Sequence, residues 1–129
     1  MRTLVIDDEF VALSRLVAIL EKIDACDAAT SGEQGLEMFR KALWDRQPYD
    51  LVIIDINMPD ANGLDLLVAF RREENRYCVP RSRKLIVSAD STAENVRAAK
   101  HGECDGFLVK PVRRAVLVEK LSALELLPA

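Results

Sequence analysis

Hydrophobic and polar residues along this chain fall into blocks with two different spacings. Short, continuous apolar runs predict buried strands at residues 3–6, 51–54, 85–87 and 106–109. Between these runs, apolar residues recur every three or four positions, which is typical of helices with one buried face. Residues 24–29 are only weakly apolar, and a strand is expected there because the alternation of strands and helices requires one.

Five helices are expected, each following one strand. Ser31 and Gln34 have the spacing of a capping box, which indicates the start of the second helix, and Asp90 or Ser91 can cap the fourth. The fourth helix has a thin apolar face, so we expect it to be held loosely. The apolar faces, in chain order, are formed by Leu13, Leu16, Val17 and Leu20; Leu36, Phe39, Ala42 and Leu43; Leu64, Leu67 and Phe70; Ala93, Val96 and Ala99; and Leu117, Leu121 and Leu124.

The segment between the third helix and the fourth strand is polar. Residues 77–84 contain Pro80 and predict an enlarged surface loop. Six basic residues from Arg71 to Lys84 would suit a phosphate-binding patch, but two glutamates interrupt them. We therefore favour a solvated loop over a binding site in this segment.

Five strands alternating with five helices indicate one α/β domain over residues 1–129, a doubly wound parallel sheet with helices on both faces. Hydrophobic residues make up 50% of the chain and charged residues 30%, which suits a domain that buries its own core. The formal charge of −3 and the few aromatic residues argue against a nucleic-acid-binding surface.

The sequence also limits where the protein works. No apolar run approaches the roughly 20 residues that cross a bilayer, and the first residues do not resemble a signal peptide. Cys26, Cys78 and Cys104 are an odd number without a C-x-x-C motif, so we expect reduced thiols rather than disulfides or a zinc site. These features predict a soluble, cytoplasmic protein.

Polar residues follow four of the five predicted strands. Asp7 and Asp8 follow the first strand, Asp55 the central one, Ser88 the fourth and Lys110 the fifth. Because the carboxyl ends of parallel strands meet at one edge of the sheet, these side chains should converge where open α/β sheets bind ligands. Each residue alone has an ordinary explanation, such as a helix cap, a turn or a surface lysine, but their joint arrangement favours a site.

Three carboxylates gathered at one place need a cation beside them. Like charges about 4 Å apart repel by roughly 4 kcal/mol at an effective dielectric constant of about 20. Oxygen ligands without nitrogen or sulfur favour a hard divalent ion, and Mg²⁺ leaves room for water and a phosphate oxygen. With Mg²⁺ held by Asp7 and Asp8, Asp55 can act as a nucleophile toward phosphorus. Lys110 and Ser88 can each contact a phosphoryl oxygen.

The sequence resembles the receiver domains of two-component response regulators over essentially its whole length. The resemblance is carried by the motifs VIDDE, LVIIDINMPDANG, LIVSAD and FLVKP, in that order. It implies a flavodoxin-like sheet with strand order 2-1-3-4-5 and a role as the phosphoacceptor switch of a phosphorelay. The implied partner is a histidine kinase or a histidine phosphotransfer protein, and the implied cofactor is Mg²⁺.

The resemblance also implies a role for each site residue. Asp55 would accept the phosphoryl group from a phosphohistidine, and Lys110 would contact the resulting acyl phosphate, with a cis peptide bond to the proline that follows. The metal would be held by Asp8 directly, by Asp7 through water, by the carboxylate of Asp55 and by the backbone carbonyl of Asn57.

Phosphorylation in this family moves a hydroxyl and an aromatic ring, which here are Ser88 and Phe107. The movement would reshape the face made by the fourth helix, fifth strand and fifth helix, where a downstream protein binds. From the residues alone, Phe107 is explained equally well as ordinary core, and it lacks the hydroxyl of the more usual tyrosine. The strength of coupling therefore stays open. The candidate output surface contains Val96, Lys100, Phe107 and Arg113.

Asn57 and Asp90 lie two residues beyond the acceptor and the switch serine, respectively. By resemblance, these positions tune the attack of water on the acyl phosphate. Because an amide and a carboxylate can orient water, we expect a phosphoryl state that lasts seconds to minutes rather than hours.

Two other functions stay open on the sequence. Small Mg²⁺-dependent phosphatases also use an aspartate nucleophile, but they usually carry a cap domain and a second aspartate where this chain has Asn57. A receiver-like binding module without phosphorylation would tend to lack the acidic pair or Lys110. His101 is better explained as a solvent-facing side chain than as a phosphohistidine. The chain either stands alone or belongs to a longer regulator, and its ending at residues 126–129 favours the former.

Overall fold

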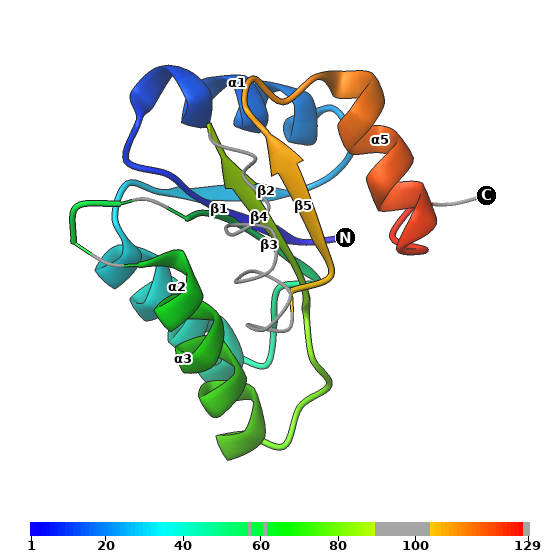
Figure 1. Cartoon of the computed structure of the whole chain (residues 1–129). Coiled ribbons are helices and arrows are strands. Elements are labelled where there is room, and N and C mark those ends of the chain that lie inside the picture. Colours follow the sequence, from blue (N-terminus) through cyan, green and yellow to red (C-terminus); the bar gives the residue numbers. More distant parts are fainter. Residues whose placement is uncertain (57, 61, 90–103, 128–129) are drawn as a thin grey trace.

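The computed structural model describes residues 1–56, 58–60, 62–89 and 104–127 and shows a parallel sheet with helices on both faces (Figure 1). The five strands are β1 (Thr3–Ile6), β2 (Cys26–Ala29), β3 (Leu51–Asp55), β4 (Arg83–Ser88) and β5 (Gly106–Val109). They are ordered β2-β1-β3-β4-β5, and all neighbours run parallel. The α/β fold and the predicted strand order are therefore confirmed.

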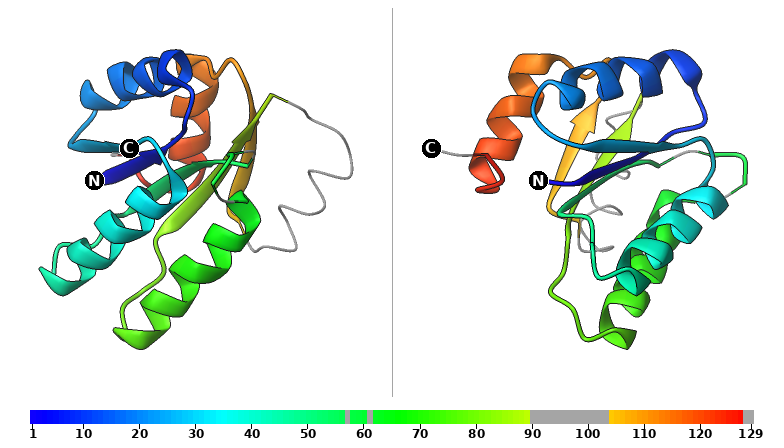
Figure 2. Two further views of the ribbon diagram at one scale, coloured as in Figure 1. Left: turned by 90° about the vertical axis from the view of Figure 1, so that its left-hand side faces the viewer. Right: turned by 180° about the vertical axis from the view of Figure 1, so that it is seen from behind.

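Helices α1 and α5 cover one face of the sheet, and α2 and α3 cover the other (Figure 2). Within the described residues, the helices are α1 (Phe10–Glu21), α2 (Gly32–Trp44), α3 (Gly63–Arg76) and α5 (Arg114–Ala123). None of these helices is long and apolar enough to span a bilayer. The helix expected after Asp90 or Ser91 falls at residues 90–103, outside the described part of the chain.

The central strand β3 lies between two hydrophobic cores. All of its residues are buried, as its continuous apolar sequence predicts. Because side chains alternate along a strand, Leu51 and Ile53 pack with α1 and α5, whereas Val52 and Ile54 pack with α2 and α3. Burial on both faces holds β3 in place, so Asp55 reaches the carboxyl edge of the sheet at a fixed position.

Helix α2 begins with the predicted cap. Ser31 Oγ accepts a hydrogen bond from the N–H of Gln34 at 3.1 Å, and the Gln34 side chain accepts one from the N–H of Thr30 at 2.8 Å. These contacts satisfy backbone donors that have no partner inside the helix. At the other end of the chain, α5 ends at Ala123 with the half-buried Leu124 as its C-cap, so the predicted apolar face extends one residue beyond the helix.

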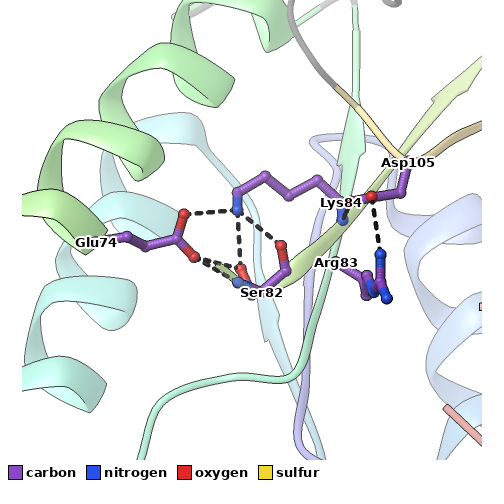
Figure 3. Close-up of polar contacts among 5 residues, drawn as sticks. All are labelled: Glu74, Ser82, Arg83, Lys84 and Asp105. Atoms are coloured by element: carbon purple, nitrogen blue, oxygen red, sulfur yellow. Dashed lines mark hydrogen bonds and ion pairs between the residues drawn. The ribbon is translucent and has the colours of Figure 1, made fainter. Parts of the chain in front are cut away.

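The polar segment before β4 agrees only in part with the prediction of a solvated loop, because residues 77–81 are exposed or half-buried but Ser82 and Lys84 are buried. Strand β4 begins at Arg83, so Lys84 belongs to the sheet and is 5% exposed. Alternation places Lys84 on the same face as Ile86, toward α3, where its Nζ lies 2.8 Å from Oε1 of Glu74 (Figure 3). Ser82 donates its N–H and its hydroxyl to Glu74 and completes a buried polar cluster. This cluster fastens the loop to α3.

Candidate functional site

Four strands bring polar side chains to the same edge of the sheet. Asp7 follows β1, Asp55 ends β3, Ser88 ends β4 and Lys110 follows β5. The backbone fixes their spacing, because the N–H of Lys110 donates to the carbonyl of Ser88 at 2.8 Å. The N–H of the residue after Asp55 donates to the carbonyl of Val87 at 3.1 Å. The convergence that parallel topology predicts is therefore present.

Lys110 lies between the acidic side chains. Its Nζ is 2.8 Å from Oδ2 of Asp7, 3.3 Å from Oδ2 of Asp55 and 3.6 Å from Oε2 of Glu9. Burial by itself would lower the pKa of Lys110, but the carboxylates of Asp7 and Asp55 outweigh burial and raise this pKa. The ammonium group therefore stays charged at neutral pH and neutralises part of the acidic cluster. The peptide bond from Lys110 to Pro111 is cis, as the resemblance implies.

Asp7, Asp8 and Asp55 each place one carboxylate oxygen within 4.8 Å of the other two. Oδ1 of Asp7 accepts the N–H of Glu9 at 2.9 Å. Oδ2 of Asp7 is buried and faces the Lys110 ammonium, but it receives no hydrogen bond within the described residues. Three carboxylates and one ammonium leave a net negative charge, and carboxylate oxygens are the ligands that Mg²⁺ prefers. The residues present therefore fit a magnesium ion.

An open hollow leads from solvent to the acidic cluster. Its lining consists of Asp8, Glu9, Asp55, Ala89 and Lys110. Asp55 is 6% exposed, so a reactant reaches its carboxylate through this hollow. A compact dianion such as a phosphoryl group can enter here once a metal ion offsets the acidic side chains, because Lys110 alone does not balance them.

The structure places some of the predicted switch residues. Ser88 is fully buried at the end of β4, and Phe107 in β5 is half-buried against the core formed with α2 and α3. Arg113 is the exposed residue that precedes α5. The remaining predicted positions, Asn57, Asp90, Val96, Lys100 and His101, lie outside the described residues.

Two acidic residues near the site had no role in the sequence-based prediction. Glu9 lines the hollow and approaches Lys110, and its position directly after Asp8 in the acidic run was an available signal. Asp60 holds the loop after Asp55 through backbone contacts to residues 32 and 33. No local pattern marks such a contact, because the two segments are distant in the sequence.

Comparisons of the sequence with a family model and with individual proteins all match proteins of two-component signalling. The response regulator receiver domain family matches residues 3–122 of this chain. The chain is 35% identical over 128 residues to the sensory/regulatory protein RpfC of Xanthomonas campestris pv. campestris, covering 96% of this chain but only 16% of RpfC. It is 32% identical over 124 residues to the chemotaxis protein CheY-3 of Vibrio cholerae, covering 94% of this chain and 88% of CheY-3.

A solved structure with the same fold carries ligands that bear on the acidic cluster. The receiver domain of the histidine kinase CKI1 from Arabidopsis thaliana, complexed with Mg²⁺ and BeF3⁻, superimposes with a TM-score of 0.81 and is 27% identical. The match covers 94% of this chain and 89% of the CKI1 domain. The acidic triad of Asp7, Asp8 and Asp55 is of the kind that forms the Mg²⁺ site in receiver domains.

Proposed function

Because the chain belongs to the response regulator receiver domain family, we propose that Asp55 accepts a phosphoryl group from the phosphohistidine of a histidine kinase or a histidine phosphotransfer protein. Membership of this family makes the chain a signalling domain rather than an enzyme. One observation carries the proposal: the Lys110 ammonium lies 2.8 Å from Asp7 and 3.3 Å from Asp55. The ends of three strands thus form a single pocket with a cation beside the acceptor.

The proposed transfer is a displacement at phosphorus. A carboxylate oxygen of Asp55 forms the new P–O bond while the P–N bond of the phosphohistidine breaks. The electron pair of that bond stays on the imidazole nitrogen, and a ring that already carries a proton on its other nitrogen leaves directly as neutral imidazole. Lys110, already beside Asp55, holds a phosphoryl oxygen by charge. Asp8, Asp7, Asp55 and the backbone carbonyl of Asn57 would hold Mg²⁺, which would supply positive charge to the phosphoryl oxygens.

Switching would begin at the end of β4. A phosphoryl group on Asp55 adds close to two negative charges and three acceptor oxygens there. The hydroxyl of Ser88 is small enough to follow one of these oxygens, and Phe107 would turn inward on the neighbouring strand β5. We expect the face made by β5 and α5 to change shape and to control a downstream partner in the cytoplasm. The fourth helix that was predicted to share this face lies outside the described residues.

The relatives support this proposal to different degrees. The complex of the CKI1 receiver domain with Mg²⁺ and BeF3⁻ supports a Mg²⁺-dependent phosphoryl pocket in this chain. RpfC is much longer than this chain, and CheY-3 is of nearly the same length, so receiver domains similar to this one occur in both settings. The partner proteins of either relative are not transferred to this chain.

Beryllofluoride with Mg²⁺ tests the proposal without a partner kinase. We expect two-dimensional NMR spectra of the wild-type protein to change around Asp55, Ser88 and Lys110. Asp55→Asn should show no such change. Asp65→Asn, at an exposed position in the first turn of α3, should respond like the wild type.

Other outcomes would favour the rival functions. If the NMR spectrum of the wild-type protein did not change on addition of beryllofluoride and Mg²⁺, the result would favour a receiver-like binding module. Repeated turnover of an external phosphate ester would favour the phosphatase.

We also propose that the phosphoryl state is short-lived, because Asn57 and Asp90 can each orient water near the acyl phosphate. Radiolabelled phosphoprotein at neutral pH should decay within seconds to minutes. A label that persists for many hours would contradict this proposal.

A further inference from the structure

Asp60 connects the loop after β3 to a helix that lies far away in the sequence. Its Oδ1 accepts the N–H of Gly32 at 3.1 Å, and its Oδ2 accepts the N–H of Glu33 at 3.1 Å. These residues lie 28 and 27 positions earlier in the chain and form the first turn of α2. The N–H groups of a first turn have no partner inside their own helix, so both donors are free to hold a carboxylate.

The start of α2 is in turn fixed to the acidic cluster. The N–H of Asp7 donates to the carbonyl of Ala29 at 3.1 Å, and Ala29 is fully buried at the end of β2. Ala29 lies three residues before Gly32. Asp60 therefore closes a ring of contacts, which runs from Asp7 through Ala29 to α2 and back along the loop to Asp55.

The loop is also fastened at its other end. The N–H of Gly63 donates to the carbonyl of Ile56 at 3.1 Å, and a Cβ at Gly63 would lie 2.9 Å from the carbonyl oxygen of Asp55. Ile56 and Met58 are buried in the core formed with α2 and α3. The backbone after the acceptor is thus held by apolar packing, by Gly63 and, on its exposed side, by Asp60.

From this geometry we infer that Asp60 is a positioning residue: it fixes residues 58–60 to the first turn of α2, and so favours the binding of Mg²⁺ beside Asp7 and Asp55. The inference rests on the proposed function, in which this loop contributes a backbone ligand to Mg²⁺. Without Asp60, the loop would have to be ordered when the metal binds, and that entropy loss would weaken the affinity for Mg²⁺. Asp60 is not among the three carboxylates of the acidic cluster, so it would act through the loop rather than as a ligand.

The carboxylate of Asp60 suits this role at neutral pH. Hydrogen bonds from the N–H groups of Gly32 and Glu33 lower the pKa of Asp60, so it stays ionised and keeps both acceptor oxygens. The contacts lie near solvent, which limits their strength. The expected effect on metal binding is therefore moderate rather than complete.

A comparison of three variants tests the inference. Asp60→Ala removes both contacts, and Asp60→Asn keeps one acceptor oxygen. Ser31→Ala is the matched control, because it removes the N-cap of the same helix, which accepts the N–H of Gln34 at 3.1 Å, without touching the loop. Isothermal titration of the metal-free proteins with Mg²⁺ gives the dissociation constant, and urea denaturation gives the stability of each variant.

We expect Asp60→Ala to raise the dissociation constant for Mg²⁺ by about threefold to tenfold, in line with the loss of a helix-capping carboxylate. Asp60→Asn should fall between Asp60→Ala and the wild type. Ser31→Ala should lose stability but keep the wild-type dissociation constant. Phosphorylation of Asp60→Ala by acetyl phosphate should be slow at low Mg²⁺ and return to the wild-type rate at saturating Mg²⁺, because the acceptor itself is unchanged.

The result that would overturn the inference is a wild-type dissociation constant in Asp60→Ala, or an equal weakening in Ser31→Ala. Either outcome would make Asp60 a helix cap and nothing more, while the wild type would still bind Mg²⁺ and accept a phosphoryl group. A wild type that binds no Mg²⁺ would overturn both this inference and the proposed function.

Discussion

Nζ of Lys110 lies 3.3 Å from Oδ2 of Asp55, although 55 residues separate them in the chain. The same ammonium reaches Asp7 at 2.8 Å, so one side chain joins the ends of β1, β3 and β5. Lys110 thereby offsets part of the negative charge of Asp7 and Asp55, and in the proposed function it also holds a phosphoryl oxygen. Mutation of Lys110 can test its role in charge balance separately from its contact with the phosphoryl group.

Lys110→Ala should slow phosphorylation by acetyl phosphate at least about tenfold, because a charge-assisted contact to the transferred group is lost. It should also lower the Tm of the metal-free protein, since Asp7 and Asp55 stay buried without a cation. Mg²⁺ should then raise the Tm of this variant more than that of the wild type. Thermal denaturation with and without Mg²⁺ measures the difference.

The control for Lys110 is an exposed lysine. Lys41→Ala removes an ammonium that pairs with Asp45 at 3.4 Å on the surface, and it should change neither the phosphorylation rate nor the response to Mg²⁺. Equal Mg²⁺ responses of the wild type and Lys110→Ala would contradict the charge-balancing role.

Gly63 begins α3 directly against the backbone of Asp55 and Ile56 at the end of β3. A Cβ at this position would lie 2.8 Å from Cα of Ile56 and 2.9 Å from the carbonyl oxygen of Asp55. Because both are backbone atoms, Gly63→Ala should displace the acceptor, lower stability by about 1–3 kcal/mol and slow phosphorylation. Urea denaturation and phosphorylation kinetics measure the two effects.

Gly106→Ala serves as the comparison for Gly63→Ala. There a Cβ would meet side-chain atoms of Leu85 and Lys120, the closest at 2.8 Å, near the amino end of β5 and away from the site. It should lower stability without slowing phosphorylation at saturating Mg²⁺. A normal phosphorylation rate in Gly63→Ala would show that the acceptor backbone tolerates the shift.

The buried pair of Glu74 and Lys84 should matter for stability and not for phosphorylation. Glu74→Ala leaves the ammonium of Lys84, a residue that is 5% exposed, without its counter-charge, and should lower the free energy of unfolding by about 3–5 kcal/mol. The double variant Glu74→Leu with Lys84→Met should be more stable than Glu74→Ala, because neither charge remains buried. Chemical denaturation measures the free energy of unfolding of the wild type and of each variant.

Arg83→Ala provides the surface control for this pair. Arg83 reaches Asp105 at 3.4 Å in an exposed position, so its loss should cost less than about 1 kcal/mol. If Glu74→Ala cost no more than Arg83→Ala, the buried pair would not be the anchor of the loop before β4.

Cys26, half-buried in β2, should make stability depend on alkaline pH. Burial raises the pKa of its thiol from 9.0 to about 11, and the negative charges of Asp27 and Glu21 make smaller contributions in the same direction. The folded state keeps a proton that the unfolded state loses, so this contribution is complete below pH 9.0 and disappears as the pH rises through about 11. Urea denaturation at about pH 8 and about pH 10 should show a smaller alkaline loss in Cys26→Ala than in the wild type.

The exposed thiol of Cys78 is the control for Cys26. Cys78→Ala should lose as much stability between the two pH values as the wild type does. If Cys26→Ala lost as much stability between the two pH values as the wild type, the proposed titration of Cys26 would be contradicted.

The fold and the acidic edge could be predicted because both depend on short patterns. The apolar residues before Asp55 identify a strand buried on both faces, and parallel topology then brings Asp7 and Lys110 to the same edge. The approach of Lys110 to Asp7 and Asp55 follows from this topology, whereas its contact with Glu9 was not predicted.

The positions of Lys84 and Asp60 could not be predicted in this way. Lys84 has polar neighbours in the sequence, and its burial depends on Glu74 in α3, ten residues earlier. Asp60 follows a proline in a turn-forming sequence, and its partners at residues 32 and 33 belong to another helix. In both cases the decisive partner is set by tertiary packing, which local periodicity does not contain.

Intact-protein mass spectrometry after incubation with acetyl phosphate and Mg²⁺ tests most directly whether Asp55 is the phosphoacceptor. The wild type should gain the mass of one phosphoryl group, and the gain should vanish when EDTA removes the metal. Asp55→Asn should gain no mass, whereas Asp65→Asn should gain as much as the wild type. A full phosphoryl gain in Asp55→Asn, or none in a wild type that binds Mg²⁺, would contradict the central claim.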